Sequence, residues 1–330
     1  MKIRVLGGGW YGCHLASTLI ADGHSVELHE IAGRLFSGAS GSNPARLHEG
    51  FHYPRSGLTR QHCQQHRAEF LSVYGHLTEG VPVNLYAVAA SDSLTDFSTY
   101  CKVLAGEVEF LRVYDPAVYG LQNVEGAVLT GERHIVIARA CAHFQNALGD
   151  VVKYRVAPGL VDDPAWDMTI DATFCANGAA NVDRYEPCVT GILEGPTDKA
   201  VTIMDGPFGS VYPWNEERGL SSLTSASLTP FSKSCTSWGQ AKALLDEVDV
   251  VAAQARCEAM VEQMAHYWPG VRAYRIVDHK LSIRAMPRSG ADARLVDVGR
   301  AGEHALRIRA GKIDAILHAG RIVKEMLCSL

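Results

Sequence analysis

The first thirty residues constrain the fold more than any other part of the chain. Residues 2–6 have the composition of a short buried strand, and Gly7-Gly8-Gly9-Trp10-Tyr11-Gly12 follows directly. Apolar residues then recur at helical spacing to about residue 22, and residues 25–30 alternate as a second strand that ends on Glu30. The order strand, G-x-G-x-x-G, helix, strand and acid predicts a βαβ unit that binds a dinucleotide.

Each part of this unit has a physical role. Gly7 permits the tight turn, Gly9 lets the backbone approach a pyrophosphate, and Gly12 lets the helix pack on the sheet. The helix N-terminus, which includes Trp10 and Tyr11, offers N–H groups to that pyrophosphate. A carboxylate at Glu30 suits two ribose hydroxyls and repels a 2′-phosphate, which disfavours NADP. The alternative is a glycine-rich turn in some other α/β domain.

Composition limits the class of protein and its partners. The chain has 330 residues and a net charge of −5 with both signs mixed, so we expect no nucleic-acid and no membrane partner. The nine cysteines form no C-x-x-C pair, which indicates reduced thiols in a cytoplasmic protein. His62 and His66 are four residues apart but have no third ligand nearby, so we expect no metal site.

The stretch after Glu30 departs from a classical NAD domain. A helix and a third strand should follow, but about 25 residues rich in glycine, serine and histidine stand there instead. The segment Ser40-Gly41-Ser42-Asn43-Pro44-Ala45-Arg46 resembles the Ser-Gly-x-Asn-Ala-Gly segment of the FAD-dependent D-amino-acid oxidase and glycine oxidase family, with Pro44 as an extra residue. The continuation Leu47-His48-Glu49-Gly50-Phe51-His52-Tyr53-Pro54 looks specific to one branch of that family.

This resemblance implies the fold class and the domains. We expect an α/β protein in which a Rossmann-like FAD-binding domain of the glutathione-reductase type is interleaved with an antiparallel α+β substrate-binding cap. The expected FAD-binding domain comprises residues 1–79, 120–185 and 281–330, and the expected cap comprises residues 80–119 and 186–280. Within the cap, apolar spacing predicts one long helix over residues 239–266.

The resemblance also implies FAD contacts outside the glycine loop. Ser40, Asn43, Ala45, Arg46, Leu47 and His48 would run along the flavin. Val152 would touch the adenine, and Asn177-Gly178 matches a second cofactor signature, although an ordinary buried strand with a glycine turn fits that pattern too. Gly311-Lys312-Ile313 would lie against the flavin pyrimidine, where a helix N-terminus stabilises negative charge. Lys312 would place a positive charge there, or would be a solvated lysine.

The expected chemistry is oxidation of a C–N bond in a small amine or amino acid, because FAD accepts a hydride at N5. By resemblance, Arg284 is the candidate for clamping a substrate carboxylate, with Arg288 as the fallback and an ordinary ion pair as the competing interpretation. His52, Tyr53 and Tyr212 are the other candidate catalytic residues, and a histidine in this loop could accept a proton from a substrate ammonium. Some relatives attach FAD through a histidine near His48, but we expect non-covalent binding.

Other functions stay open at this point. The histidine- and tyrosine-containing loop also suits a flavin-dependent tailoring enzyme or a sugar-nucleotide mutase in a biosynthetic pathway. A plain NAD-dependent dehydrogenase is disfavoured by the missing third βα unit, and a non-enzymatic dinucleotide-binding module would show no reduction by any amine. The expected partner is a small-molecule substrate, and a homodimer is compatible with the sequence.

Overall fold

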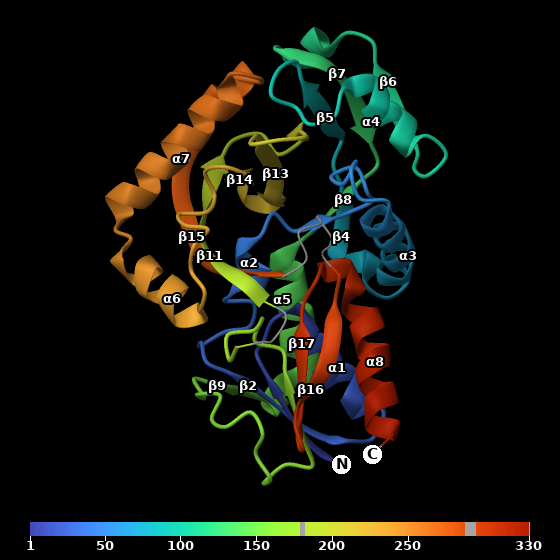
Figure 1. The fold of residues 1–330 in the computed structure, drawn as a ribbon, viewed down its shortest axis with the longest axis vertical. Helices are drawn as coiled ribbons and strands as arrows, with labels where there is room; N and C mark the ends of the chain where they lie inside the picture. The colour runs from blue at the N-terminus through green and yellow to red at the C-terminus, as the bar shows by residue number, and fades with distance from the viewer. Residues whose placement is uncertain (179–181, 288–294, 330) are drawn as a thin grey trace.

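A computed structural model describes residues 1–178, 182–287 and 295–329. Two large sheets organise these residues, one in the lower and one in the upper half of Figure 1. The chain passes between the two sheets several times, because each contains strands from the first third and the last third of the sequence. The two halves are therefore interleaved, as the sequence predicts.

The six-stranded sheet contains the predicted βαβ unit. Its strand order is β16-β17-β10-β1-β2-β9, and all neighbours are parallel except β16 and β17, which form a hairpin. The strands are β1 (Lys2–Leu6), β2 (Ser25–Glu30), β9 (Val152–Tyr154), β10 (Met168–Asp171), β16 (Asp297–Gly302) and β17 (Ala305–Arg309). In parallel sheets of this kind, ligands bind beyond the carboxyl ends of the strands.

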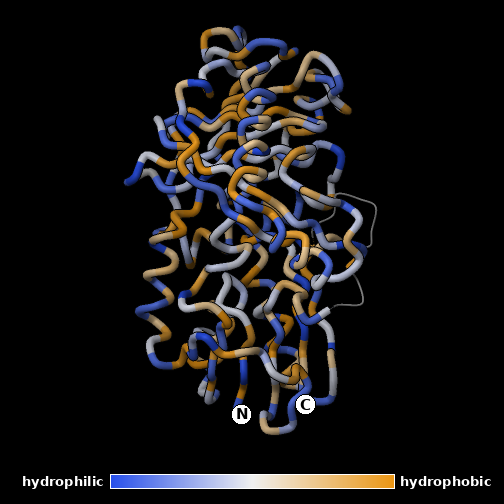
Figure 2. Tube along the Cα trace, turned by 90° about the vertical axis from the view of Figure 1, so that its left-hand side faces the viewer, coloured by the Kyte–Doolittle hydropathy of each residue, from blue (hydrophilic) through white to orange (hydrophobic). Residues whose placement is uncertain are grey.

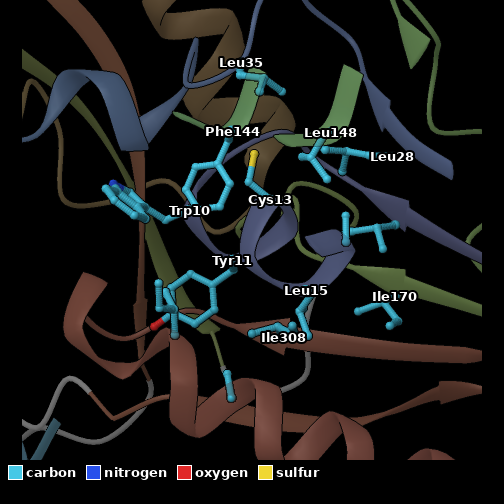
Figure 3. Packing of buried hydrophobic residues seen from close by; sticks show 14 of the residues in the cluster. Trp10, Tyr11, Cys13, Leu15, Leu28, Leu35, Phe144, Leu148, Ile170 and Ile308 are labelled. Carbon is cyan, nitrogen blue, oxygen red and sulfur yellow. The ribbon is translucent and has the colours of Figure 1, made fainter. Parts of the chain in front are cut away.

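Three helices pack together beside this sheet: α1 (Trp10–Ala21), α5 (Ile137–Leu148) and α8 (Ile316–Cys328). Their apolar sides form one core with the central strands, as Figure 3 shows for Trp10 beside Phe144 and for Leu15 near Ile308. The Trp10 and Phe144 ring centroids lie 5.6 Å apart in an edge-on arrangement, which aromatic quadrupoles favour. This packing fixes the N-terminus of α1 against the sheet.

The eight-stranded sheet forms the cap. Its order is β15-β11-β14-β13-β12-β5-β7-β6, and all neighbours are antiparallel except β12 and β5. The strands are β5 (Val83–Ala89), β6 (Phe110–Val113), β7 (Val124–Thr130), β11 (Val182–Glu194), β12 (Lys199–Met204), β13 (Gly209–Asn215), β14 (Leu220–Ser225) and β15 (Arg275–Pro287). Helices α4 (Phe97–Leu104), α6 (Trp238–Glu247) and α7 (Val250–Ala265) accompany it. Figure 2 shows apolar segments passing through the interior of both halves.

A three-stranded sheet contains the loop expected near the flavin. Its order is β3-β8-β4, formed by β3 (Arg46–Leu47), β8 (Arg133–Ile135) and β4 (Thr78–Gly80). The short helix α2 (Ala39–Ser42) precedes it, and α3 (Gly57–Tyr74) follows β3. The remaining elements are 3-10 turns, of which η6 (Ile313–Ala315) leads into α8. Pairing with β8 ties the loop to a segment more than 80 residues later in the chain.

Two sequence-based expectations differ from the structure. Residues 239–266 form two helices, because Asp249 caps a new helix with its carboxylate on the Ala252 N–H. Strand β7 pairs with β5 and β6 in the cap sheet, although residues 120–185 were expected in the FAD-binding domain. Strands β11 and β15 also extend past the expected boundaries at residues 185 and 281. In the described residues, no helix has the length and apolar character needed to span a membrane.

Candidate functional site

The glycine loop lies at the carboxyl end of β1, where its three signature glycines meet close neighbours. Gly7 has a φ of +98°, a conformation that side chains rarely adopt. A Cβ on Gly9 would lie 2.8 Å from Ser40 Oγ, and one on Gly12 would lie 1.9 Å from the Gly7 carbonyl oxygen. Gly7 and Gly12 therefore require glycine because of the backbone around them, and a side chain at Gly9 would displace Ser40; the approach of a pyrophosphate to Gly9 stays a prediction.

Glu30 ends β2 directly beside this loop. The side chain is buried, and its two oxygens accept hydrogen bonds from the Gly8 N–H at 2.6 Å and the Ala32 N–H at 2.8 Å. The carboxylate thus joins the end of β2 to the glycine loop. This is the position that a ribose-binding acid occupies in a dinucleotide-binding βαβ unit.

The segment after Glu30 folds back onto α1. Ser40 Oγ accepts a hydrogen bond from the Trp10 N–H at 3.1 Å, so α2 touches the first turn of the nucleotide-binding helix. The Asn43 side chain bridges the Ala39 carbonyl and the Ala45 N–H, each at 2.7 Å, and supports a positive φ of 53° at Ala45. This loop leads directly into β3, and Leu47 is fully buried there.

The turn after β17, near the C-terminal end of the sequence, also contacts the first turn of α1. The Tyr11 hydroxyl donates to the Lys312 carbonyl at 2.5 Å, which links the first turn of α1 to the residues before α8. The Lys312 ammonium lies 3.5 Å from the centroid of the Tyr53 ring and 2.5 Å from Cys63 Sγ. Gly311 and Ile313 flank this lysine on the turn. Lys312 is therefore not a solvated lysine.

These groups together fit FAD. Glu30, the glycine loop and the N-terminus of α1 suit the adenosine and the pyrophosphate, and the segment 40–48 with the turn at 311–313 lies next to them. When bound, FAD supplies two-electron chemistry by accepting a hydride. The described residues contain no group of three or more side chains suited to a metal ion.

A buried ion pair lies where the loop meets the cap. Arg46 Nε is 3.8 Å from a carboxylate oxygen of Glu132, which is fully buried and directly precedes β8. Burial favours the neutral acid, but His48, Arg46 and Tyr86 hold the pKa of Glu132 below its usual value. Glu132 also accepts from the Glu49 N–H at 2.8 Å. Arg46 and Glu132 are therefore both charged. Because Glu132 contacts both Arg46 and the Glu49 N–H, it holds this part of the loop in place.

Cap strands complete the surroundings of Arg46. Its guanidinium donates to the Tyr86 hydroxyl at 2.9 Å and to Ser210 Oγ at 2.6 Å, and it lies 4.2 Å from the Tyr212 ring centroid. Tyr86 in turn donates to Glu132. The Asn84 amide donates to the Tyr212 hydroxyl at 3.1 Å. Sequence reasoning named Arg46 and Tyr212 but missed Tyr86, Asn84, Glu132 and Ser210, which have no motif and meet only in the folded chain.

The loop histidines differ in their surroundings. His48 Nδ1 is 3.6 Å from Glu132, and burial lowers the pKa of His48 to about 4, so the imidazole is neutral at neutral pH. His52 is exposed and lies 3.4 Å from an Arg46 nitrogen. The Tyr53 ring lies within 5.3 Å of both histidine rings and carries Lys312 on its face. The structure therefore brings His48, His52, Tyr53, Arg46 and Lys312 together.

Arg284 lies on β15, a strand that also packs against α2, and it already has a charged partner. Its guanidinium donates to a carboxylate oxygen of Glu186 at 2.7 Å, because the two residues face each other in the β11–β15 pairing. Glu186 also pairs with Arg184. This geometry is that of the competing ion-pair interpretation, in which the charge of Arg284 is balanced within the cap sheet. The fallback residue Arg288 lies outside the described residues.

The remaining predicted contacts lie along the six-stranded sheet. Val152 pairs with Leu28 of β2, two residues before Glu30. The Asn177 side chain is a hydrogen-bond donor to Asp171 and Thr173, and Gly178 follows with a φ of +81°. These contacts make Asn177 part of the turn that ends β10, at the same edge of the sheet as the glycine loop.

Comparisons with known proteins decide the family. A scan against models of known protein families finds no match. The FAD-dependent monooxygenase FPY4 of Fusarium mangiferae is 35% identical over 338 residues, which cover 99% of this chain and 91% of that protein. This chain belongs to the same family of FAD-dependent oxidoreductases. The FAD-dependent monooxygenase kojA of Aspergillus flavus is 28% identical over 309 residues, covering 82% of this chain and 72% of kojA. FAD as the cofactor is thereby confirmed.

Solved structures confirm the fold of this family member. Glycine oxidase from Geobacillus kaustophilus has a TM-score of 0.69 at 16% identity and covers 98% of this chain and 93% of its own. NikD, described as an unusual amino acid oxidase essential for nikkomycin biosynthesis, has a TM-score of 0.69 at 14% identity, with 97% and 92% covered. The resemblance to the D-amino-acid oxidase fold, an FAD-binding domain with a cap, is therefore correct.

Proposed function

We propose that this FAD-dependent oxidoreductase oxidises a C–N bond of a small amine or amino acid, with FAD as the hydride acceptor and oxygen or another acceptor restoring the oxidised cofactor. The observation that carries the proposal is the cluster of His48, His52, Tyr53 and Arg46 beside the Lys312 turn. The similarity in fold to glycine oxidase and NikD supports the same chemistry.

In this proposal His52 receives the proton of the substrate ammonium. An amine gives up a hydride readily only in its neutral form, so a nearby base must take that proton. His52 is the exposed histidine of this loop, and histidine is the side chain that most often acts as a general base near neutral pH. Burial lowers the pKa of His48 to about 4, so the His48 imidazole is too weak a base for this step.

The cofactor is the first thing to test. The visible absorption spectrum of the purified protein is recorded before and after acid precipitation. Flavin bands released into the supernatant support non-covalent FAD, whereas bands that remain with the pellet identify a covalent link and point to His48. A colourless protein that takes up no added FAD contradicts the whole proposal.

Substrate oxidation is tested without oxygen, where loss of the visible flavin absorption reports reduction by each compound in a panel of amines and amino acids. We expect reduction by at least one of them, and the flavin of a His52→Gln variant that retains FAD should be reduced about 100-fold more slowly, the size expected for losing a general base. A panel in which no amine reduces the flavin, while dithionite does, contradicts C–N oxidation.

A second candidate function is monooxygenation, which the names of FPY4 and kojA favour. It differs from oxidation in the fate of oxygen, because one oxygen atom enters the product. Turnover under ¹⁸O₂ followed by mass spectrometry of the product separates the two. Label in the product supports monooxygenation, and unlabelled product with one hydrogen peroxide per turnover supports oxidation.

A further inference from the structure

Asp314 is a buried acid that neither the proposed reaction nor the cofactor contacts use. It lies in η6, at the entry to α8, and only 3% of its surface is exposed. Both carboxylate oxygens are buried, and no side chain among the described residues donates a hydrogen bond to them, although the backbone N–H groups of Asp314 and Ala315 favour the charged form. A buried carboxylate without a side-chain donor is costly, so a group of this kind in a native fold calls for an explanation.

A small cavity beside Asp314 offers one. It has a volume of about 10 Å³, which is room for one water molecule. The cavity is lined by Asp314 and Lys312 from the turn, by Thr59, His62, Cys63 and His66 from α3, and by Leu295, Val296 and Ala315. The carboxylate therefore faces a polar space in which a water molecule can donate to it.

Lys312 links this cavity to the FAD site. Its carbonyl accepts from Tyr11 on the nucleotide-binding helix, while its ammonium lies against Cys63 and the Tyr53 ring. Burial opposes the charge of Lys312, but Tyr53, Cys63 and Asp314 raise its pKa, so it stays cationic. The nearby histidines are neutral at neutral pH, since burial lowers the pKa of His62 and lowers that of His66 to about 4. Among these residues, Lys312 is therefore the cation that faces Asp314.

We propose that Asp314 and one water molecule in this cavity form a proton-holding site that controls how much of the positive charge of Lys312 acts on the bound FAD. With Asp314 ionised, the carboxylate balances Lys312. With Asp314 protonated, the charge of Lys312 is free to stabilise a negative charge on the cofactor, which reduction of a flavin creates. Asp314 therefore acts through Lys312: its protonation changes the charge that the cofactor experiences, and it does not contact the substrate.

The groups around Asp314 fix the pH at which the change takes place. Burial raises the pKa of Asp314 to about 7, while Lys312 acts in the opposite direction and Glu132 adds to the rise. Tyr11 stays neutral, because burial and Asp314 both raise its pKa. The titratable and charged groups that face Asp314 are Lys312, Cys63, His62, His66, Tyr11 and Glu132.

The test is the midpoint reduction potential of the FAD-loaded protein, measured across pH with dithionite as reductant. For the native protein we expect an inflection near pH 7 that Asp314→Asn lacks. Above that pH the variant should favour reduced FAD about tenfold more than the native protein, which for two electrons is about 30 mV. Below it the two potentials should coincide. Glu325→Gln, which removes an exposed carboxylate on α8, is the matched control and should follow the native protein.

A second variant and a second readout keep the proposal falsifiable. Lys312→Met should lower the potential and move the inflection to higher pH, because Asp314 then lacks its cation. If Asp314→Asn does not fold, infrared difference spectra of the native protein decide, since a protonated carboxyl band should disappear near pH 7. Identical pH profiles for the native protein and Asp314→Asn, or no such band, overturn the proposal. Because dithionite replaces the substrate, these outcomes do not depend on C–N oxidation.

Discussion

Arg46 and Glu132 form a buried pair that joins the loop after α2 to the cap. Replacing Glu132 with Ala leaves the guanidinium buried without its carboxylate, so we expect a loss of about 3–5 kcal/mol in the free energy of unfolding. Denaturant unfolding measures this loss. The control is Glu79→Ala, which breaks a pair with Arg139 whose side chains are 35% and 38% exposed, and which should cost about 1 kcal/mol or less. Equal losses in the free energy of unfolding for the two variants would contradict the argument that the buried pair stabilises the fold more than the exposed pair does.

Glu30 is the residue on which FAD affinity should depend most directly. A Glu30→Ala variant loses the carboxylate that both holds Gly8 and suits the ribose hydroxyls. Because hydrogen bonds to a charged group contribute about 1.5–3 kcal/mol, we expect FAD binding to weaken about 10- to 100-fold. Fluorescence titration of the apoprotein with FAD measures it. Glu27→Ala, on the same strand with its side chain 42% exposed, is the control and should bind FAD as the native protein does.

At the level of elements, the packing of α1 on the sheet depends on Gly12. A Gly12→Ala substitution places a Cβ 1.9 Å from the Gly7 carbonyl oxygen, so α1 has to move away from the loop. We expect both a lower melting temperature and a loss of FAD binding. Gly75→Ala is the matched control, because its φ is −55° and a Cβ there meets nothing within 4 Å. It should be neutral or slightly stabilising, and a Gly12→Ala protein that behaves like it would contradict the packing argument.

The elements also show what local sequence can and cannot predict. The βαβ unit follows from periodicity and glycines within a short window. The break between α6 and α7 was missed, although Asp249 is a recognisable N-cap. Membership of β7 in the cap sheet was missed because it depends on pairing with β5, which lies some 40 residues earlier.

The residues of the candidate site also differ in whether the sequence could predict them. The glycine loop and Glu30 were predictable because they belong to one supersecondary unit, whereas Ser40 was named from the family resemblance. Glu132 and Tyr86 were not, since they meet Arg46 only when β8 and β5 are in place. Arg284 was chosen by its position in the family pattern, and its pairing with Glu186 depends on the register of β11 against β15.

For the whole molecule, we expect stability to fall in mild acid. Burial lowers the pKa of His14, His48, His66 and His134 to about 4, below their unfolded value of 6.5. Between these values the unfolded chain binds protons that the folded protein does not, so stability decreases as pH falls from 6.5 to about 4. Asp314 acts in the opposite direction, because its pKa is raised to about 7, but it is one group against four.

Thermal unfolding measured across this pH range tests the expectation. The melting temperature should fall steadily below pH 6.5 and level off near pH 4. A His14→Gln variant should show a shallower fall of the melting temperature, because one of the four histidines is removed. A melting temperature that is constant over the range, or that rises toward acid, would contradict the burial of these histidines in neutral form.

The strand order of the six-stranded sheet has a consequence for how the protein is made. Strand β1 lies in the middle of that sheet, but its neighbour β10 begins at Met168 and the strand beyond, β17, begins at Ala305. A ribosome therefore exposes the glycine loop long before it has synthesised the strands and the Lys312 turn that enclose it. We therefore expect the protein to retain FAD only after β17 and the Lys312 turn have been synthesised, and a chain that stops before residue 305 should not retain it.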